Sequence, residues 1–209
     1  MPVSPEIWLA FAAAAALLIA IPGPTTLMVM GHTMASGARI GLLSLIGVTL
    51  GDVCAITLSV LGFSALLAAS ATAFLVMKWL GAAYLVWIGI KLWRSAPAEL
   101  KPLVQSRGGA GRAIMQTFLV TLLNPKGILF FAAFLPQFID HTRPLWPQVL
   151  VFMITFDVLA ALIQGGYILA MGRARGAVAS PRLLKTMNRA GGAMLVGAGL
   201  LTATLKRAA

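Results

Sequence analysis

Hydrophobic residues fill most of the chain in long stretches, with few polar positions between them. A helix needs about 20 mainly apolar residues to cross the hydrocarbon core of a bilayer. Five stretches reach that length, and a sixth, rich in Gly, approaches it. The predicted spans are Ile7–Met30, Ile40–Ala69, Ala73–Trp93, Ala113–Phe138, Leu145–Met171 and Ala190–Leu205. The pattern therefore predicts an all-α membrane protein with six transmembrane helices in a single domain, residues 1–209.

The composition excludes the other broad classes of protein. Of 209 residues, 60% are hydrophobic and only 10% are charged, whereas a soluble domain has about 25% charged residues. Disorder is excluded because the chain is too apolar to stay solvated. Cys54 is the single cysteine, so an internal disulfide is impossible. The first six residues carry no basic group, so we expect the first span to remain as a membrane helix rather than a cleaved signal peptide.

The charge is strongly basic, with sixteen Lys and Arg against five Asp and Glu. A net charge of +11 in a soluble chain would suggest a nucleic-acid partner, but here the basic residues gather in alternate connections between spans, as topogenic signals do. The first, third and fifth connections with their flanks hold Arg39, Lys91, Arg94, Lys101, Arg107, Arg112, Arg173, Arg175, Arg182, Lys185 and Arg189, and the other side holds Arg143, Lys206 and Arg207. We therefore expect the first, third and fifth connections to be cytoplasmic and both termini to be periplasmic. We expect no nucleic-acid partner.

Three charged residues fall deep inside the predicted spans. At about 1.5 Å of rise per residue, Asp52 and Asp157 lie roughly 18 Å along their helices and Lys126 roughly 20 Å, near the midplane of a core about 30 Å thick. A charge at this depth costs at least about 2.5–3.5 kcal/mol on insertion scales and normally faces a cavity or a partner. A structural ion pair would explain one such group. Three groups of both signs favour a functional site.

Two spans contain residues that interrupt a helix. The first has the sequence Ile21–Thr26, in which prolines remove backbone donors and Gly23 frees the backbone. In the fourth, Asn124 is a preferred N-cap and Pro125 a preferred first residue for a new half-helix. Its free N–H groups, beside Lys126, would attract a carboxylate. A simple proline kink is the alternative for either break alone, but two matched breaks favour a site. The binding residues predicted in and beside the breaks are Pro22, Gly23, Pro24, Thr25, Asn124, Pro125 and Lys126.

The two halves of the chain run through the same order of features. Pro24 and Pro125 are 101 positions apart, and Asp52 and Asp157 are 105 positions apart. With three spans each, the halves would have opposite orientations in the membrane. We predict an inverted repeat, with residues 1–94 and 113–209 as its halves and 95–112 as a cytoplasmic loop, and with the first and fourth helices broken. This arrangement is typical of secondary transporters.

The remaining signals are weaker. Gly47 and Gly51 form a small-residue pair that predicts close packing against another helix. Gln164 would either line a cavity or hydrogen-bond a neighbouring helix. His32 and His141 fall at expected loop positions without ligand-spaced neighbours, so no metal site is predicted. The sequence has no Walker motif and indicates no cofactor.

The charges near the midplane suit a zwitterion such as an α-amino acid. The turn at Asn124 and the Lys126 ammonium would take the carboxylate, and Asp52 or Asp157 would take the ammonium group. A carboxyl group in an apolar medium can also exchange a proton. The driving force would then be an ion gradient or the gradient of the substrate itself.

The sequence resembles the LysE/RhtB family of amino-acid exporters over essentially its whole length. The resemblance rests on Ile21–Pro24, Gly47 with Gly51–Asp52, Lys78 with Gly81–Leu85, Leu123–Lys126 and Leu135–Phe138. It implies a six-helix transporter of the bacterial inner membrane that exports L-amino acids or close derivatives from the cytoplasm, by exchange for protons. Asp52 and the Asn124–Pro125 turn match the family's positions, whereas Asp157 follows only from its depth. The resemblance indicates a transporter, not an enzyme, and leaves a homodimer open.

Two other functions stay open at this point. An exporter of a metal or other cation would need a cluster of acidic or His ligands, and an integral-membrane enzyme would need clustered acids near the cytoplasmic surface. The acids of this chain are instead scattered, and two lie near the midplane.

Overall fold

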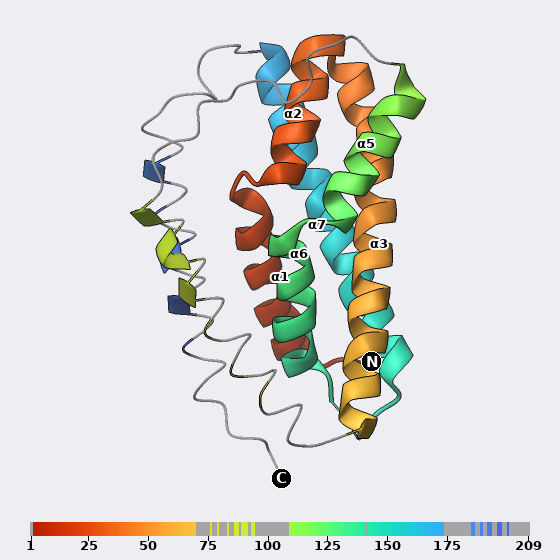
Figure 1. Cartoon of the computed structure of the whole chain (residues 1–209), viewed down its shortest axis with the longest axis vertical. Coiled ribbons are helices and arrows are strands. Elements are labelled where there is room, and N and C mark those ends of the chain that lie inside the picture. The colour runs from red at the N-terminus through yellow and green to blue at the C-terminus, as the bar shows by residue number, and fades with distance from the viewer. Residues whose placement is uncertain are drawn as a thin grey trace.

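A computed structural model describes residues 2–69, 109–140 and 142–173, with scattered positions between 76 and 94 and between 185 and 200. These residues form helices and no strand (Figure 1). By length and composition, two helices are able to cross a membrane, or up to four spans if each of two bent helix pairs counts as one. The predicted all-helical class is confirmed for the described residues. The first, second, fourth and fifth predicted stretches are confirmed as helices or bent helix pairs of suitable length and composition to span a membrane.

The first bent pair consists of α1 (Pro5–Ala20) and α2 (Pro24–Ser36), which meet at 53°. Ser4 caps α1 by accepting a hydrogen bond from the Ile7 N–H at 3.4 Å. The helix is interrupted where the sequence predicts a break. α2 then continues past the expected end of the first span to Gly37, where a φ of +88° favours glycine and ends the helix.

His32 therefore does not lie in a loop, as the sequence suggested. It belongs to α2, where its side chain is 2% exposed and its Nε2 has no hydrogen-bond partner. The prediction was wrong because a run of polar residues after Met30 resembles a span end, while the residue that terminates the helix comes later. His141 lies outside the described residues.

Two long helices cross the whole height of the molecule. α3 covers Ala38–Ala69 and α7 covers Leu145–Arg173, and both run beside the two bent pairs (Figure 1). Their apolar segments Ala38–Gly62 and Leu145–Met171 are each long enough to span a bilayer. They support the shorter half-helices, which cannot span a membrane singly.

The second bent pair begins with α5 (Ala110–Leu122) and continues after a break with α6 (Pro125–Leu129). A π-helical turn, η1 (Phe130–Phe134), and a 3-10 turn, η2 (Leu135–Phe138), follow directly. The two halves are bent by 43°. The fourth predicted span is thus also a broken helix, and π turns inside helices are frequent at functional sites.

The Gly pair in α3 packs directly against α5, as predicted. A Cβ added to Gly47 would overlap the Ile114 carbonyl oxygen and lie 2.9 Å from the Phe118 backbone nitrogen. A Cβ added to Gly51 would lie 2.7 Å from the Thr121 Cβ. The absence of side chains at these two positions therefore lets the backbones of α3 and α5 meet.

The buried apolar side chains of the described residues form two separate clusters. The larger one surrounds α1, η1 and the first half of α7, and contains phenylalanines in close ring contact, such as Phe11 with Phe152 at 4.6 Å. The smaller one joins α2, α3 and the second half of α7 through Val29, Val48 and Ile168. The two helix breaks lie between these clusters.

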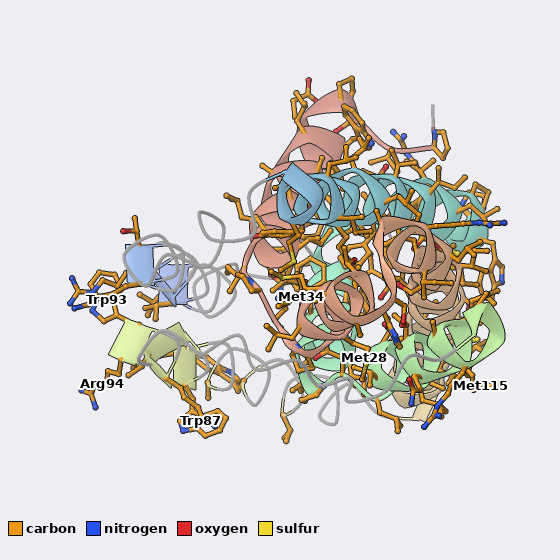
Figure 2. All side chains as sticks on the ribbon, turned by 90° about the horizontal axis from the view of Figure 1, so that it is seen from above. Met28, Met34, Trp87, Trp93, Arg94 and Met115 are labelled. Carbon is orange, nitrogen blue, oxygen red and sulfur yellow. The ribbon has the colours of Figure 1, made fainter. Side chains whose placement is uncertain are left out.

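The third and sixth predicted spans lie mostly outside the described residues. Two described glycines from them are in close contact: a Cβ on Gly89 would lie 2.6 Å from the Gly192 carbonyl oxygen. Seen from above, Trp87, Trp93 and Arg94 lie to one side of the bundle, away from Met115 of α5 (Figure 2). Whether these stretches complete two further membrane spans stays a prediction.

Candidate functional site

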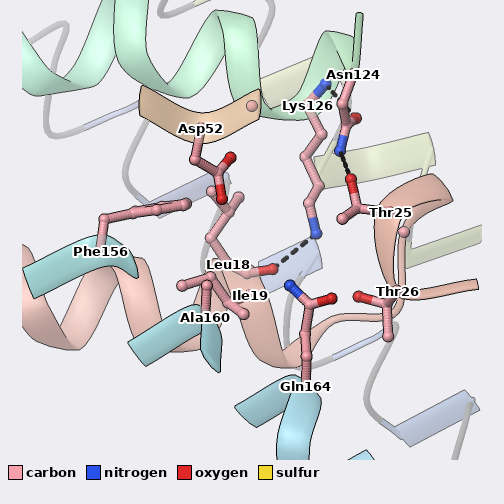
Figure 3. Close-up of a pocket in the computed structure, with 12 residues that line it drawn as sticks. Leu18, Ile19, Thr25, Thr26, Asp52, Asn124, Lys126, Phe156, Ala160 and Gln164 are labelled. Atoms are coloured by element: carbon pink, nitrogen blue, oxygen red, sulfur yellow. Dashed lines mark hydrogen bonds between the residues drawn. The ribbon is translucent and has the colours of Figure 1, made fainter. Parts of the chain in front are cut away.

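The two helix breaks meet in the interior of the molecule. The Asn124 side-chain amide, at the start of α6, donates to the Thr25 hydroxyl oxygen in the first turn of α2 at 3.1 Å (Figure 3). The Thr121 hydroxyl, in the last turn of α5, hydrogen-bonds the same Thr25 oxygen at 3.3 Å. These buried contacts join segments about a hundred positions apart and bring the predicted binding turns together.

The start of α6 is organised as the sequence predicts. The Asn124 side-chain oxygen accepts a hydrogen bond from the Lys126 N–H at 3.1 Å, and Pro125 occupies the first turn. The start of α2 differs, because its N-cap is Gly23, which has no side chain to accept from the first N–H groups. Of the two half-helix starts, α2 therefore has the first-turn N–H groups that no capping side chain occupies.

Side chains from the second half of the chain replace the backbone donors that the prolines remove from α1. In a continuous helix the carbonyls of Leu18 and Ala20 would accept from residues 22 and 24, which are prolines. Instead, the Lys126 ammonium donates to the Leu18 carbonyl at 2.7 Å and to the Ile21 carbonyl at 2.9 Å. The Tyr167 hydroxyl of α7 donates to the Ala20 carbonyl at 2.6 Å. A cation and a hydroxyl thus occupy the negative end of the α1 dipole.

Lys126 consequently has a role that sequence reasoning did not foresee. Two of its three N–H donors hold the end of α1. The ammonium lies at the break itself, since a Cβ on Gly23 would be 3.3 Å from it. One donor remains for a ligand.

Asp52 lies on α3 across the cavity from this ammonium (Figure 3). Its side chain is 7% exposed, and within the described residues it has no hydrogen bond and no ion pair. The Lys126 ammonium and the Asp52 carboxyl group therefore act on each other electrostatically across the cavity but form no close ion pair. A buried carboxyl group in this situation is unusual, because burial of an unpaired charge is costly.

A cavity of about 40 Å³ lies between these groups. A water molecule needs about 10–15 Å³ on such a measure, so the cavity holds a few waters in this conformation. Five of the predicted site residues line it, namely Gly23, Thr25, Asp52, Asn124 and Lys126. The other lining residues are Leu18, Ile19, Thr26, Gly127, Phe156, Ala160 and Gln164.

The remaining predicted residues are not among the lining residues. Pro22, Pro24 and Pro125 shape the breaks. Asp157 follows Phe156 on α7, and its side-chain oxygen Oδ1 is buried without a hydrogen-bond partner. Gln164, for which the sequence left two roles open, lines the cavity, and its buried amide oxygen has no hydrogen-bond partner among the described residues. The α7 positions 156, 160 and 164 recur every four residues, which is the one sequence signal that relates them.

Comparisons with known proteins agree on one family. Residues 16–206 match the family model of the LysE type translocators. A membrane protein of Vibrio cholerae is 37% identical over 201 residues, which cover 96% of this chain and 98% of the relative. The homoserine/homoserine lactone efflux protein of Salmonella typhimurium is 34% identical over 204 residues, covering 97% and 98%. The leucine efflux protein of Salmonella choleraesuis is 31% identical over 131 residues, covering 62% of each chain.

No solved structure matches the chain. The family model and two of the relatives nonetheless match along nearly the full length of the chain. The chain belongs to the LysE type translocator family.

Proposed function

We propose that this protein exports small L-amino acids or close derivatives from the cytoplasm in exchange for protons. The observation that carries the proposal is the cavity between the two breaks, with a lysine ammonium on one side and an unpaired aspartate on the other. A zwitterion fits this arrangement and a simple cation does not, because a cation has no partner for the ammonium. The names of the efflux relatives support an amino-acid substrate.

The substrate carboxylate binds at the lysine side of the cavity. The backbone N–H groups of Thr25 and Thr26 at the start of α2 have no capping side chain, because the N-cap residue is Gly23, and the Lys126 ammonium retains one donor. A carboxylate accepts such charge-assisted hydrogen bonds well. Asn124 and Pro125 contribute by positioning Lys126 and Thr25, since the Asn124 oxygen is already used as the helix cap.

The substrate ammonium binds Asp52, and this contact couples transport to protons. An unpaired carboxyl group in the cavity is neutral when it carries a proton, and it is also neutralised when it pairs with the substrate ammonium. Proton and amino acid therefore compete for the same group, which is the requirement for exchange. Asp157, whose buried Oδ1 has no partner, lies on the adjacent helix and passes the proton onward.

Reciprocal contacts support the inverted repeat with six spans. With an offset of 101 positions, Thr25 corresponds to Lys126 and Gly23 corresponds to Asn124. Thr25 contacts Asn124, and Lys126 correspondingly lies against Gly23. A second reciprocal set involves the third and sixth stretches. A Cβ on Gly89 would lie 2.8 Å from the Val196 backbone nitrogen, and one on Gly192 would lie 2.8 Å from the Trp93 backbone nitrogen. Gly89 and Gly192 are 103 positions apart, and so are Trp93 and Val196, so the two contacts are related by exchange of the halves, as a two-fold relation requires.

The orientation follows from the basic residues. The connections after the first, third and fifth spans lie in the cytoplasm and both termini in the periplasm, in the inner membrane of a bacterium. In that orientation the phenylalanine cluster lies on the periplasmic side of the cavity, and the smaller cluster around Val29 lies on the cytoplasmic side.

The test uses purified protein in liposomes loaded with a labelled amino acid. We expect exchange that is accelerated by a proton gradient and that Asp52→Asn abolishes, because asparagine neither carries a proton nor neutralises an ammonium. Asp140→Asn is the matched control, since Asp140 lies at a partly exposed ion pair with Arg143, away from the cavity. Absence of flux for all common amino acids, homoserine and its lactone would overturn the proposal, as would an unchanged rate in Asp52→Asn.

A further inference from the structure

Helix α7 presents one stripe of three side chains to the cavity. Phe156, Ala160 and Gln164 all line it, and their spacing of four residues places them on one face of the helix. The stripe changes in chemistry along its length, from an aromatic ring through a methyl group to an amide. Nothing in the proposed binding of carboxylate and ammonium uses these three residues.

Gln164 is the polar exception on this wall. Its side chain is 3% exposed, and its amide oxygen is buried without a hydrogen-bond partner. Figure 3 shows the amide extending from α7 toward Thr26 and the end of the Lys126 side chain, into the cavity that these residues line. Buried polar groups in proteins are nearly always hydrogen-bonded, and leaving one unsatisfied costs free energy. A ligand in the cavity supplies the missing partner.

The rest of the wall limits the size of what binds there. Phe156 packs against the rings of both Phe130 and Phe131, with centroids 5.9 and 4.8 Å away. Its ring therefore forms a fixed end to the cavity. Ala160, between Phe156 and Gln164, has only a methyl group and leaves space for a short substituent. Leu18 and Ile19 of α1 lie beside Ala160 and add apolar surface to the lining (Figure 3).

These observations define where a substrate side chain lies, and this step rests on the proposed function. Once the carboxylate binds Lys126 and the ammonium binds Asp52, the part of the cavity left for the side chain is bounded by Leu18, Ile19 and the α7 stripe. Its middle is apolar, and the polar groups at its end are the Gln164 amide and the neighbouring Thr26 hydroxyl. A short chain that ends in a hydrogen-bonding group satisfies both parts.

We propose that Gln164 is a specificity-determining residue, which selects amino acids with a short neutral side chain ending in a hydroxyl or similar polar group over aliphatic side chains of the same size. The amide hydrogen-bonds the terminal group of the substrate, while Ala160 provides space beside it and Phe156 closes the opposite end of the stripe. A purely aliphatic substrate leaves the amide without a partner and is disfavoured for that reason.

Homoserine and norvaline are suitable probes, because they have nearly the same shape and differ by a hydroxyl in place of a methyl group. In liposome exchange, we expect the wild type to prefer homoserine by roughly 10-fold in competition, the ratio that about one buried hydrogen bond provides. Gln164→Leu should reduce this preference to about 2-fold or less, while norvaline exchange stays the same or rises. The retained norvaline flux shows that the variant is folded.

The outcomes separate this inference from the proposed function. If the wild type exchanges both probes with protons but at equal rates, the specificity inference is wrong and the export function stands. If it exchanges neither these nor other amino acids, the proposed function fails. Should Gln164→Leu be misfolded, Gln164→Met offers a flexible apolar side chain of similar length. A homoserine preference that survives in a folded Gln164→Met also overturns the inference.

Discussion

The close contact between α3 and α5 is the clearest structural requirement of the site, and Gly47→Ala tests it. The added methyl group would overlap the Ile114 carbonyl oxygen and lie 2.9 Å from the Phe118 nitrogen. Both are backbone atoms and cannot rotate away. Since ordinary contacts of this kind need about 3.5 Å, the helices must separate by roughly 0.5 Å or more.

That separation reaches the site through α5. Thr121 hydrogen-bonds Thr25 at 3.3 Å, which is already a long hydrogen bond. A displacement of α5 by roughly 0.5 Å would break it. We therefore expect Gly47→Ala to lower the exchange rate as well as the stability, although Gly47 is not a cavity-lining residue.

A matched control isolates the size of the effect. Gly62 lies on the same helix, and a Cβ there would meet no atom within 4 Å. Both substitutions gain the same helix propensity, about 1 kcal/mol, so this gain cancels in the comparison. The difference is the overpacking cost of about 1–3 kcal/mol. At about 2–4 °C per kcal/mol for a chain of this size, Gly47→Ala should melt roughly 2–12 °C below Gly62→Ala in detergent. Equal melting temperatures for the two variants would refute the reasoning.

Two further predictions concern the breaks. Lys126→Met removes the hydrogen bonds to the carbonyls of Leu18 and Ile21, worth about 1.5–3 kcal/mol each, but it also removes a buried charge that costs about 2.5–3.5 kcal/mol. Stability should therefore change by about 3 kcal/mol or less, while amino-acid exchange stops; continued exchange by a folded Lys126→Met would exclude Lys126 from binding. Asn124→Ala removes the cap of α6 and should cost about 1 kcal/mol, seen as a melting temperature roughly 2–4 °C lower. Asn124→Asp keeps the cap but not the donation to Thr25. It should therefore recover part of the stability that Asn124→Ala loses. A melting temperature no higher than that of Asn124→Ala would contradict the capping role.

The position of the helix breaks was predictable from the sequence because its causes are local. Pro24 has no N–H, and Asn124 and Pro125 have strong preferences for the first positions of a helix. The structure places breaks at both sites. The Gly pair in α3 was predictable for the same reason, since small residues four apart produce a flat face whatever the partner.

The contacts across the breaks were not predictable, because they depend on segments far apart in the chain. The carbonyls that Lys126 binds lie 105 and 108 positions earlier, and no local pattern relates them. The lining face of α7 was hidden for a different reason. Apolar residues surround this helix on every side, so hydrophobic periodicity does not mark its inner face. Gln164 was recognisable as a polar residue in a span, but its two possible roles could be separated only by its surroundings.

The arrangement of α1 explains why the cavity must change size during transport. A volume of about 40 Å³ holds a few water molecules, which is less than an amino acid occupies. The end of α1 forms one wall and is held there by Lys126 and Tyr167. Under the proposed mechanism, an incoming carboxylate accepts from the third Lys126 donor and attracts the ammonium away from the Leu18 and Ile21 carbonyls. Its binding therefore weakens the contacts that hold α1, and the prolines leave no backbone hydrogen bonds at positions 22 and 24 to resist a movement. Occupancy of the site and the position of α1 are coupled through one ammonium group.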